Sequence, residues 1–277
     1  MIAPRWWAAF LAALIAPGCG PNGAGGEGDG PQESAGRPTI VSLNPCTDAV
    51  LAEVAAPGQL LAISHYSHDP RASSMDAAKA RAFPATGGTV EEVLALDPDV
   101  VVAGSFMAPA TRAAFTQLGM RVETFGIAGS VEESHAQTRR LAALAGDAVA
   151  GEALVQRIDA SLTPSHGGTV PSVTLWQPGG IVPGETQLVS ELLFRAGLSS
   201  HTARQGMQQA DYLPLERVMA DPPDVLLIAG SERGQRHPAL AELDGMAVAR
   251  LDPNLIYCGG PTMIRAMERL REVREAV

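Results

Sequence analysis

Residues that could bind a metal or carry out acid–base chemistry lie together at His65, His68 and Asp69. Imidazole and carboxylate groups ligate transition metals, but two histidines three residues apart share a face only on a helix. Ser64 beside His65 resembles part of a nucleophilic triad, yet adjacent residues of one loop rarely reach triad geometry. We expect a polar loop here, with contact between His65 and a metal-containing ligand as the alternative.

The sequence lacks the motifs of common enzyme classes. It contains no Gly-x-Ser-x-Gly elbow, phosphate-binding loop, His-Glu-x-x-His or Cys-x-x-Cys pattern. The net charge of −10 and the pI near 5.0 argue against nucleic-acid binding, which needs a clustered basic surface. We therefore expect no catalytic residues, no resident cofactor and no nucleic-acid partner.

One sequence pattern occurs twice in the chain. Residues 89–102 and residues 214–227 each combine a short acidic-apolar helix, a Pro-Asp turn and an apolar strand. The strand runs 100–102 and 225–228 show no polar alternation, which is typical of parallel strands buried on both faces. The repeat predicts two similar α/β lobes with a ligand cleft between them.

The other elements fit this organisation. Strand–helix alternation predicts a mostly parallel sheet with flanking helices in each lobe. Ser130 and Glu133 form a capping box that begins a helix reaching Ala145, and a second helix follows Asp147. We assign residues 37–130 to the N-terminal lobe, 131–163 to a helical linker and 169–277 to the C-terminal lobe. A backbone helix of about 16 residues would be about 24 Å long and permit only small closure.

Further strands and helices are expected at defined positions. Strands are predicted at residues 39–43, 60–64, 121–125, 170–176 and about 255–258, and helices at about 109–118, 187–196 and 262–275.

The N-terminus predicts export. Arg5 and a short apolar run precede Ala16-Pro17-Gly18-Cys19, which resembles a bacterial lipoprotein cleavage box although Ala and Pro are unusual there. We expect a signal peptide over residues 1–18, lipidation of Cys19 and a Gly/Pro/Glu-rich flexible tether over 19–36. The alternative is an ordinary secretory signal cut nearby. Both alternatives place the protein in the periplasm, in the first case anchored to a membrane by lipid.

Three segments together resemble a known family. They are Ile40-Val41-Ser42-Leu43-Asn44-Pro45, Ile63-Ser64-His65-Tyr66-Ser67, and residues 88–100 with their Glu and Pro-Asp-Val motif. This order resembles the helical-backbone, or class III, periplasmic substrate-binding proteins of ABC importers for cobalamin, iron–siderophores and haem. The resemblance covers nearly all of residues 38–277. It implies a monomer that captures a metal chelate and delivers it to a dimeric permease.

The resemblance also assigns docking residues. In the family, one exposed glutamate per lobe pairs with arginines of the two permease subunits, and the matching positions are Glu91 and Glu216. A receptor with two similar lobes should present the same charge twice to a two-fold partner. The alternative is that both acids only complement the helix dipole.

By family position, loops after the strands line the cleft, where ligands of α/β sheets bind. The aromatic members could clamp a flat macrocycle or aromatic chelator. The expected ligand-binding residues are Cys46, Thr47, His65, Tyr66, Ser105, Phe106, Trp176, Gln177, Tyr212, Cys258 and Gly259.

Cys46 and Cys258 leave three alternatives open. They are unpaired small residues, a cross-cleft disulfide in an oxidising compartment, or contacts to a metal-bearing ligand. A disulfide needs Cα atoms within about 7 Å, which an open cleft would not normally allow.

The ligand is the open question. Corrinoid and ferric siderophore rank first, haem follows with Tyr66 or His65 as the axial ligand, and a bare metal ion comes last. An anionic siderophore would need cleft arginines, with candidates at Arg81, Arg112, Arg204, Arg233 and Arg236. A sensor or scaffold lipoprotein outside transport is the other functional alternative.

Overall fold

The computed structural model describes residues 36–164, 167–208 and 210–277. The expected signal peptide, Cys19 and nearly all of the expected tether lie outside the described residues. Residues 36–277, with the gaps just given, belong to one compact unit. In that part of the chain no helix is long and apolar enough to cross a membrane.

The first lobe is built on a parallel five-stranded sheet with the order β3-β2-β1-β4-β5. Its strands are β1 (Ile40–Ser42), β2 (Leu60–Ser64), β3 (Ala85–Thr86), β4 (Val100–Gly104) and β5 (Arg121–Phe125). Its helices are α1 (Pro45–Val54), α2 (Ala77–Ala80), α3 (Val90–Leu96) and α4 (Pro109–Gln117), with a 3₁₀ turn η1 (His65–His68) after β2.

The second lobe contains a parallel four-stranded sheet with the order β11-β10-β6-β8 and a small antiparallel pair, β7 with β9. The strands are β6 (Ser172–Trp176), β7 (Ile181–Val182), β8 (Ser199–Ser200), β9 (Asp211–Tyr212), β10 (Val225–Ile228) and β11 (Ala247–Arg250). The helices are α7 (Leu188–Arg195), α8 (His201–Arg204), α9 (Leu215–Ala220) and α10 (Thr262–Glu275), with 3₁₀ turns η2 (Pro178–Gly180), η3 (Gly234–Arg236), η4 (Pro238–Glu242) and η5 (Pro253–Ile256).

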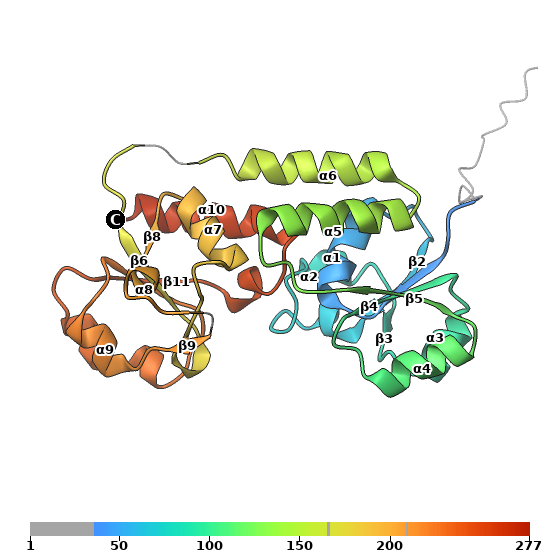
Figure 1. Ribbon diagram of the computed structural model, residues 1–277, viewed down its shortest axis with the longest axis horizontal. Coiled ribbons are helices and arrows are strands. Elements are labelled where there is room, and N and C mark those ends of the chain that lie inside the picture. Colours follow the sequence, from blue (N-terminus) through green and yellow to red (C-terminus); the bar gives the residue numbers. More distant parts are fainter. Residues whose placement is uncertain (1–35, 165–166, 209) are drawn as a thin grey trace, which may run out of the picture. The chain divides into compact units, whose positions relative to one another are not determined.

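Two helices connect the lobes. The chain leaves β5, forms α5 (Val131–Leu144), reverses, and returns through α6 (Ala148–Ser161). Helices α5 and α6 pack against each other, α6 also contacts α1 and α10, and Figure 1 shows α5, α6 and α10 on the same side of the two sheets. The connection, predicted as a helical linker over residues 131–163, is therefore a packed layer of helices.

Alternation along the strands divides the core into three clusters. Ile40 and Val102 of the first sheet and Val173 and Leu227 of the second face one cluster, which the helical layer shares. Their neighbours along the strands face the opposite way, into a separate cluster within each lobe. The central strands β4 and β10 are thus buried on both faces, which explains the apolar strands of the repeat.

The Pro-Asp turn of the repeat fixes strand register in both lobes. Asp99 Oδ2 accepts hydrogen bonds from Thr39 N at 2.7 Å and Thr39 Oγ1 at 2.9 Å. In the second lobe Asp224 Oδ2 accepts from Ser172 N and Ser172 Oγ, both at 2.7 Å. Each aspartate joins the amino ends of two neighbouring strands. The repeat is therefore a structural motif as well as a sequence motif.

One predicted strand is wrong. Residues 255–258 contain no strand, because Asp252 caps the 3₁₀ turn η5 instead, and the last strand of the second sheet is β11 at Ala247–Arg250. The alternation of small residues with Val248 and Arg250 leaves β11 partly exposed, as expected of an edge strand. The terminal helix is observed at the predicted residues, as α10.

Candidate functional site

Side chains from both lobes and from α5 enclose a cavity, called the interlobe pocket below. Asn44 follows β1, Phe106 follows β4 and Ile127 follows β5, so the first lobe contributes the carboxyl edge of its sheet. This is the edge at which α/β sheets bind ligands. The second lobe contributes residues 187–189 and 256–260, and α5 contributes Ser134, Gln137, Thr138 and Leu141.

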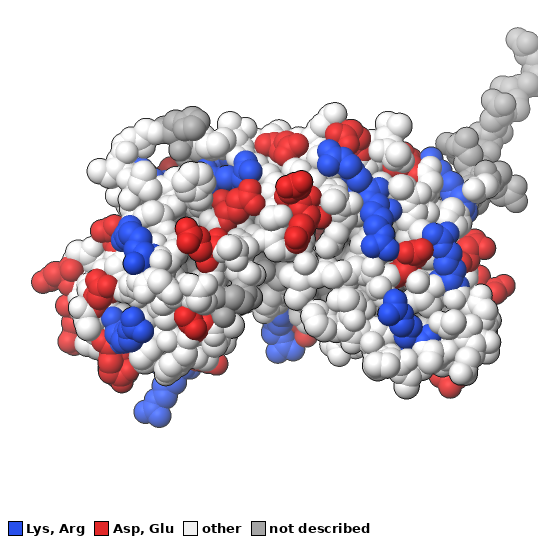
Figure 2. Space-filling model, in the orientation of Figure 1, with Lys and Arg blue, Asp and Glu red and all other residues white. Residues whose placement is uncertain are grey.

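The pocket is small. Its volume is about 120 Å³, below the roughly 300–1,000 Å³ of most small-molecule sites. A macrocyclic chelate would therefore also need the open surface next to it. The space-filling view shows the face hollowed between the lobes (Figure 2), and the acidic and basic side chains on that face form small mixed groups.

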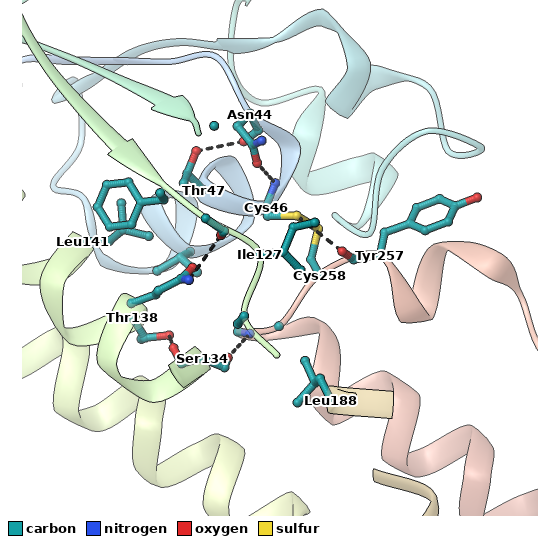
Figure 3. A pocket seen from close by; sticks show the side chains of 18 of the residues that line it. Asn44, Cys46, Thr47, Ile127, Ser134, Thr138, Leu141, Leu188, Tyr257 and Cys258 are labelled. Atoms are coloured by element: carbon teal, nitrogen blue, oxygen red, sulfur yellow. Dashed lines mark hydrogen bonds between the residues drawn. A yellow bond between two sulfur atoms is a disulfide. The ribbon is translucent and has the colours of Figure 1, made fainter. Parts of the chain in front are cut away.

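A disulfide between Cys46 and Cys258 forms part of the pocket wall. Their Cα atoms are 5.3 Å apart although 212 residues separate them in the sequence. Among the three alternatives for these cysteines, the structure supports the disulfide. In Figure 3, Leu141 and Thr138 lie on one side of it and the Tyr257 ring points away on the other. The two lobes are covalently joined where they approach each other.

Hydrogen bonds accompany this covalent link. Ser74 Oγ of the first lobe donates to Asn254 O, and Asn254 Nδ2 donates to Pro70 O at 3.1 Å. Gly260 N donates to Ser134 Oγ of α5 at 2.7 Å, and a Cβ at Gly259 would come within 2.4 Å of the same oxygen. Glycine at 259 thus permits the close approach of the second lobe to α5.

Local interactions at the start of α1 place Cys46 and Thr47 at the pocket. Asn44 caps the helix by accepting from Cys46 N at 2.8 Å. Thr47 Oγ1 lies 2.9 Å from Asn44 O and 2.8 Å from Ser42 Oγ. A Cβ at Gly104 would lie 2.6 Å from Asn44 Nδ2, so the glycine at the end of β4 leaves room for the capping side chain.

Asp48, one residue further along α1, is a buried carboxylate with only neutral hydrogen-bond donors. Its Oδ2 accepts from Ser64 N at 3.0 Å and from Ser67 Oγ at 2.6 Å. Its Oδ1 is buried and has no hydrogen-bond partner among the described residues. Burial raises the pKa of Asp48 to about 7, and the hydrogen bonds from Ser42, Ser67 and Ser64 oppose this only partly.

The predicted ligand-binding residues fall into two groups. Those that line the interlobe pocket are Cys46, Thr47, Phe106, Cys258 and Gly259. Those that do not line it are His65, Tyr66, Ser105, Trp176, Gln177 and Tyr212.

Trp176 lies in the core of the second lobe instead of on a cleft wall. It is 3 % exposed, and its Nε1 donates to Leu213 O at 2.9 Å. As the last residue of β6 it takes the face that points into that lobe's own apolar cluster. Tyr212 is 63 % exposed and lies in the β7–β9 pair.

His65 and Tyr66 form an exposed pair directly after β2. The Tyr66 side chain is 55 % exposed, and its ring centroid lies 4.1 Å from that of His65. Since β2 runs parallel to β1, this pair lies at the same sheet edge as Asn44. His68 instead lies within hydrogen-bond distance of Ala80 O and Phe83 O, and Asp69 pairs with Arg71, so both serve local structure.

The sequence did not indicate several pocket residues. Tyr257 adjoins Cys258 and is 47 % exposed, and Ile127 lies on the loop that leads into α5. The position of Ile127 after a predicted strand was an available signal. The contribution of α5 could not be predicted from the sequence, because its pocket-facing residues have the pattern of an ordinary amphipathic helix.

Glu91 and Glu216 occupy equivalent places in α3 and α9. Each is the second residue of its helix and is exposed. Neither side chain forms a hydrogen bond or ion pair with any residue that the structure describes. The neighbouring Glu92 differs, because it accepts from Thr86 Oγ1 and Gly87 N and thereby caps the turn before α3.

Comparison with known proteins supports this architecture. A family model described as "Periplasmic binding protein" matches residues 40–247. No curated protein sequence matches the chain.

Solved structures of periplasmic binding proteins share the fold. The periplasmic haem-binding protein HutB of Vibrio cholerae superposes with a TM-score of 0.70 at 13% identity, over 85% of this chain and 98% of that one. The periplasmic haem-binding protein RhuT of Roseiflexus sp. RS-1 superposes with a TM-score of 0.65 at 19% identity, over 87% of this chain and 98% of that one. The periplasmic vitamin B12-binding protein BtuF of Vibrio cholerae superposes with a TM-score of 0.62 at 16% identity, over 86% of this chain and 96% of that one. At these identities the likeness establishes the fold alone.

Loss of the disulfide should destabilise the protein. The link closes a loop of about two hundred residues, so the double variant Cys46→Ser/Cys258→Ser should lower the free energy of unfolding by about 2–5 kcal/mol. Urea unfolding of the variant and of the wild type measures this difference. Wild type in the presence of a thiol reductant is the control and should match the variant. Equal unfolding midpoints for oxidised wild type and variant would show that the link does not stabilise the fold.

Asp48 should make stability depend on pH. The folded carboxyl titrates near 7 and the unfolded one near 3.8, so the folded state binds the extra proton between these values. The free energy of unfolding therefore falls as pH rises from about 4 to about 7 and is level above that. Asp48→Asn removes this dependence and should gain stability relative to wild type by about 1.4 kcal/mol per pH unit across that window. Urea unfolding of both proteins at pH 5 and pH 8 tests this, and an unchanged difference between them would contradict it.

Proposed function

The chain belongs to the periplasmic binding protein family, and from this premise we propose that it captures haem and delivers it to the permease of an ABC importer. The family consists of binding proteins, which confirms the expectation that the protein is not an enzyme. The observation that carries the choice of ligand is the exposed His65–Tyr66 pair at the carboxyl edge of the first sheet. A tyrosine hydroxyl is an established axial ligand of haem iron.

Other groups fit a flat, anionic chelate. Phe106 and Tyr257 offer exposed aromatic surface on opposite lobes. Arg233 and Arg236 follow β10, whose carboxyl end shares an edge with that of β11, from which the chain leads to Cys258. Neither arginine forms an ion pair within the described part of the chain, so both are available to carboxylates of a ligand.

Two of the three other candidate arginines fit this role less well. Arg112 donates to Thr124, and Arg204 bonds to Ser199 and His201. An anionic siderophore would therefore rely on Arg81, Arg233 and Arg236, the candidate arginines whose side chains form no hydrogen bond or ion pair within the described residues. Several of the similar solved structures are of proteins named for haem binding, which favours haem over the siderophore.

A corrinoid is the second candidate. The apolar lining by Phe106 and Ile127 suits a macrocycle with few charges, and one similar structure is a vitamin B12-binding protein. Cobalamin or cobinamide binding without haem binding would select this candidate. Binding of neither, in a titration that includes ferric siderophores, would leave the ligand outside the tetrapyrroles.

Removal of the Tyr66 hydroxyl should weaken haem binding. Titration of the protein with haemin, followed by absorbance, should show a saturable complex. The variant Tyr66→Phe should lose the absorbance band that arises from tyrosinate bound to iron. Its affinity for haemin should fall at least about tenfold, which corresponds to about 1.4 kcal/mol of binding free energy. Tyr257→Phe is the matched control, because it removes a hydroxyl of similar exposure from the other lobe. If Tyr257→Phe loses the band and Tyr66→Phe keeps it, the axial ligand comes from the second lobe.

Glu91 and Glu216 are proposed as the permease-docking residues. Their equivalent positions and unpaired side chains suit contact with a two-fold partner. The variant Glu91→Ala/Glu216→Ala should lose most ligand uptake in cells while its affinity for ligand stays unchanged. Glu132→Ala/Glu268→Ala is the control, since it removes the same charge from other exposed positions, one of them also the second residue of a helix. Normal uptake by the Glu91/Glu216 variant would contradict the docking role, and normal uptake in cells that lack the protein would support the sensor or scaffold alternative.

A further inference from the structure

Asp48 lies behind the exposed His65–Tyr66 pair. Its Oδ2 accepts from Ser64 N at 3.0 Å and from Ser67 Oγ at 2.6 Å. Residues 64–67, called the Tyr66 turn below, thus have both ends bound to one carboxylate oxygen. Ser64 extends the connection, since its Oγ accepts from Tyr66 N at 3.3 Å.

We propose that Asp48 is a positioning residue of the ligand site, which holds the Tyr66 turn so that His65 and Tyr66 face the ligand. This inference rests on the proposed function for the identity of the ligand but not for the role of the turn.

The burial pattern supports this role. Asp48, Ser64 and Ser67 are almost completely buried, whereas His65 and Tyr66 between them are exposed. The turn therefore has an inner side fixed to α1 and an outer side that carries two aromatic rings in contact. On the outer side, His65 Nδ1 lies 3.3 Å from Thr86 O, which adds a second and weaker restraint on the ring.

The choice of a carboxylate at this position also needs an explanation. The groups that face it are neutral: Ser42 from β1, Ser64 from the end of β2 and Ser67 from η1. A buried charge without a counter-charge is unfavourable, so stability alone would favour an uncharged side chain. A side-chain oxygen at this position, however, accepts two hydrogen bonds at once and so binds both ends of the turn. The geometry points to a role in fixing the turn.

Two variants of Asp48 separate the acceptor from the charge. Asp48→Ala removes the acceptor of the hydrogen bonds from Ser64 N and Ser67 Oγ. Amide hydrogen exchange of residues 64–68 should become faster, and the Kd for haemin should rise by about tenfold or more, as expected for the loss of these hydrogen bonds. Asp48→Asn keeps an oxygen acceptor and should stay within about threefold of wild type in both measurements.

Asp224→Ala is the matched control for loss of stability. Asp224 also binds two donors through one oxygen, Ser172 N and Ser172 Oγ, but it lies in the other lobe at the amino end of β10. This variant should unfold at lower urea concentration and bind haemin as tightly as wild type. Equal weakening of haemin binding in Asp224→Ala and Asp48→Ala would overturn the proposal, because general destabilisation would then explain both.

The outcomes distinguish this inference from the proposed function. Failure of the wild type to bind haemin would refute the proposed ligand, and the exchange rates of the Tyr66 turn would still decide the role of Asp48. Unchanged exchange of residues 64–68 in Asp48→Ala would overturn the inference even if the wild type binds haemin tightly. If the wild type binds haemin, faster exchange without a change in haemin affinity would also overturn the inference, since the turn would then not position the ligand contacts.

Discussion

One apolar cluster runs from the first sheet through the helices between the lobes and into the second sheet. Ile40 and Val102 at one end and Val173 and Leu227 at the other belong to it, with residues of α5, α6 and α10 between them. Protein interiors are close-packed, so separation of the sheets would expose apolar surface to water. That exposure costs about 25 cal/mol of free energy per Å². The lobes are therefore held together on the helical side, and the interlobe pocket forms where the cluster ends. The position of candidate contacts on one lobe relative to those on the other depends on this arrangement.

The Cys46–Cys258 disulfide adds a second restraint next to the pocket. The lobes are thus joined by packing on the helical side and by a covalent bond near the carboxyl edges of the sheets, so movement between them is limited to small rotations. Binding that requires little closure has little ordering to oppose it. Recognition must then depend on side chains that are already exposed. Tyr66, Phe106 and Tyr257 therefore contribute more to ligand binding than closure of the lobes does.

Much of the fold could be predicted from the sequence, because its main signals are local. The strand runs that follow the two Pro-Asp turns are apolar throughout, and each is buried on both faces as the pattern requires. The Pro-Asp turns that contain Asp99 and Asp224 are also visible as a repeated local pattern, although the residues that these aspartates bind, Thr39 and Ser172, are distant in the sequence. The strand expected at 255–258 failed because a short apolar run does not distinguish a strand from a 3₁₀ turn, and the capping Asp252 decided between them.

The site could be predicted only in part, because its residues acquire their roles from neighbours distant in the sequence. Trp176 and Tyr66 both come from the end of a strand, yet Trp176 ends on the face of β6 that packs inward, whereas Tyr66 lies beyond β2 on a turn. Asp48 and Glu91 are both acids in the first turns of helices, and neither is distinctive by type or spacing. Asp48 packs beneath the end of β2, which makes it an internal anchor, while Glu91 faces away from the sheet and remains exposed. A carboxylate gains its function from what packs against it, and that contact is set by the arrangement of the sheet and its helices.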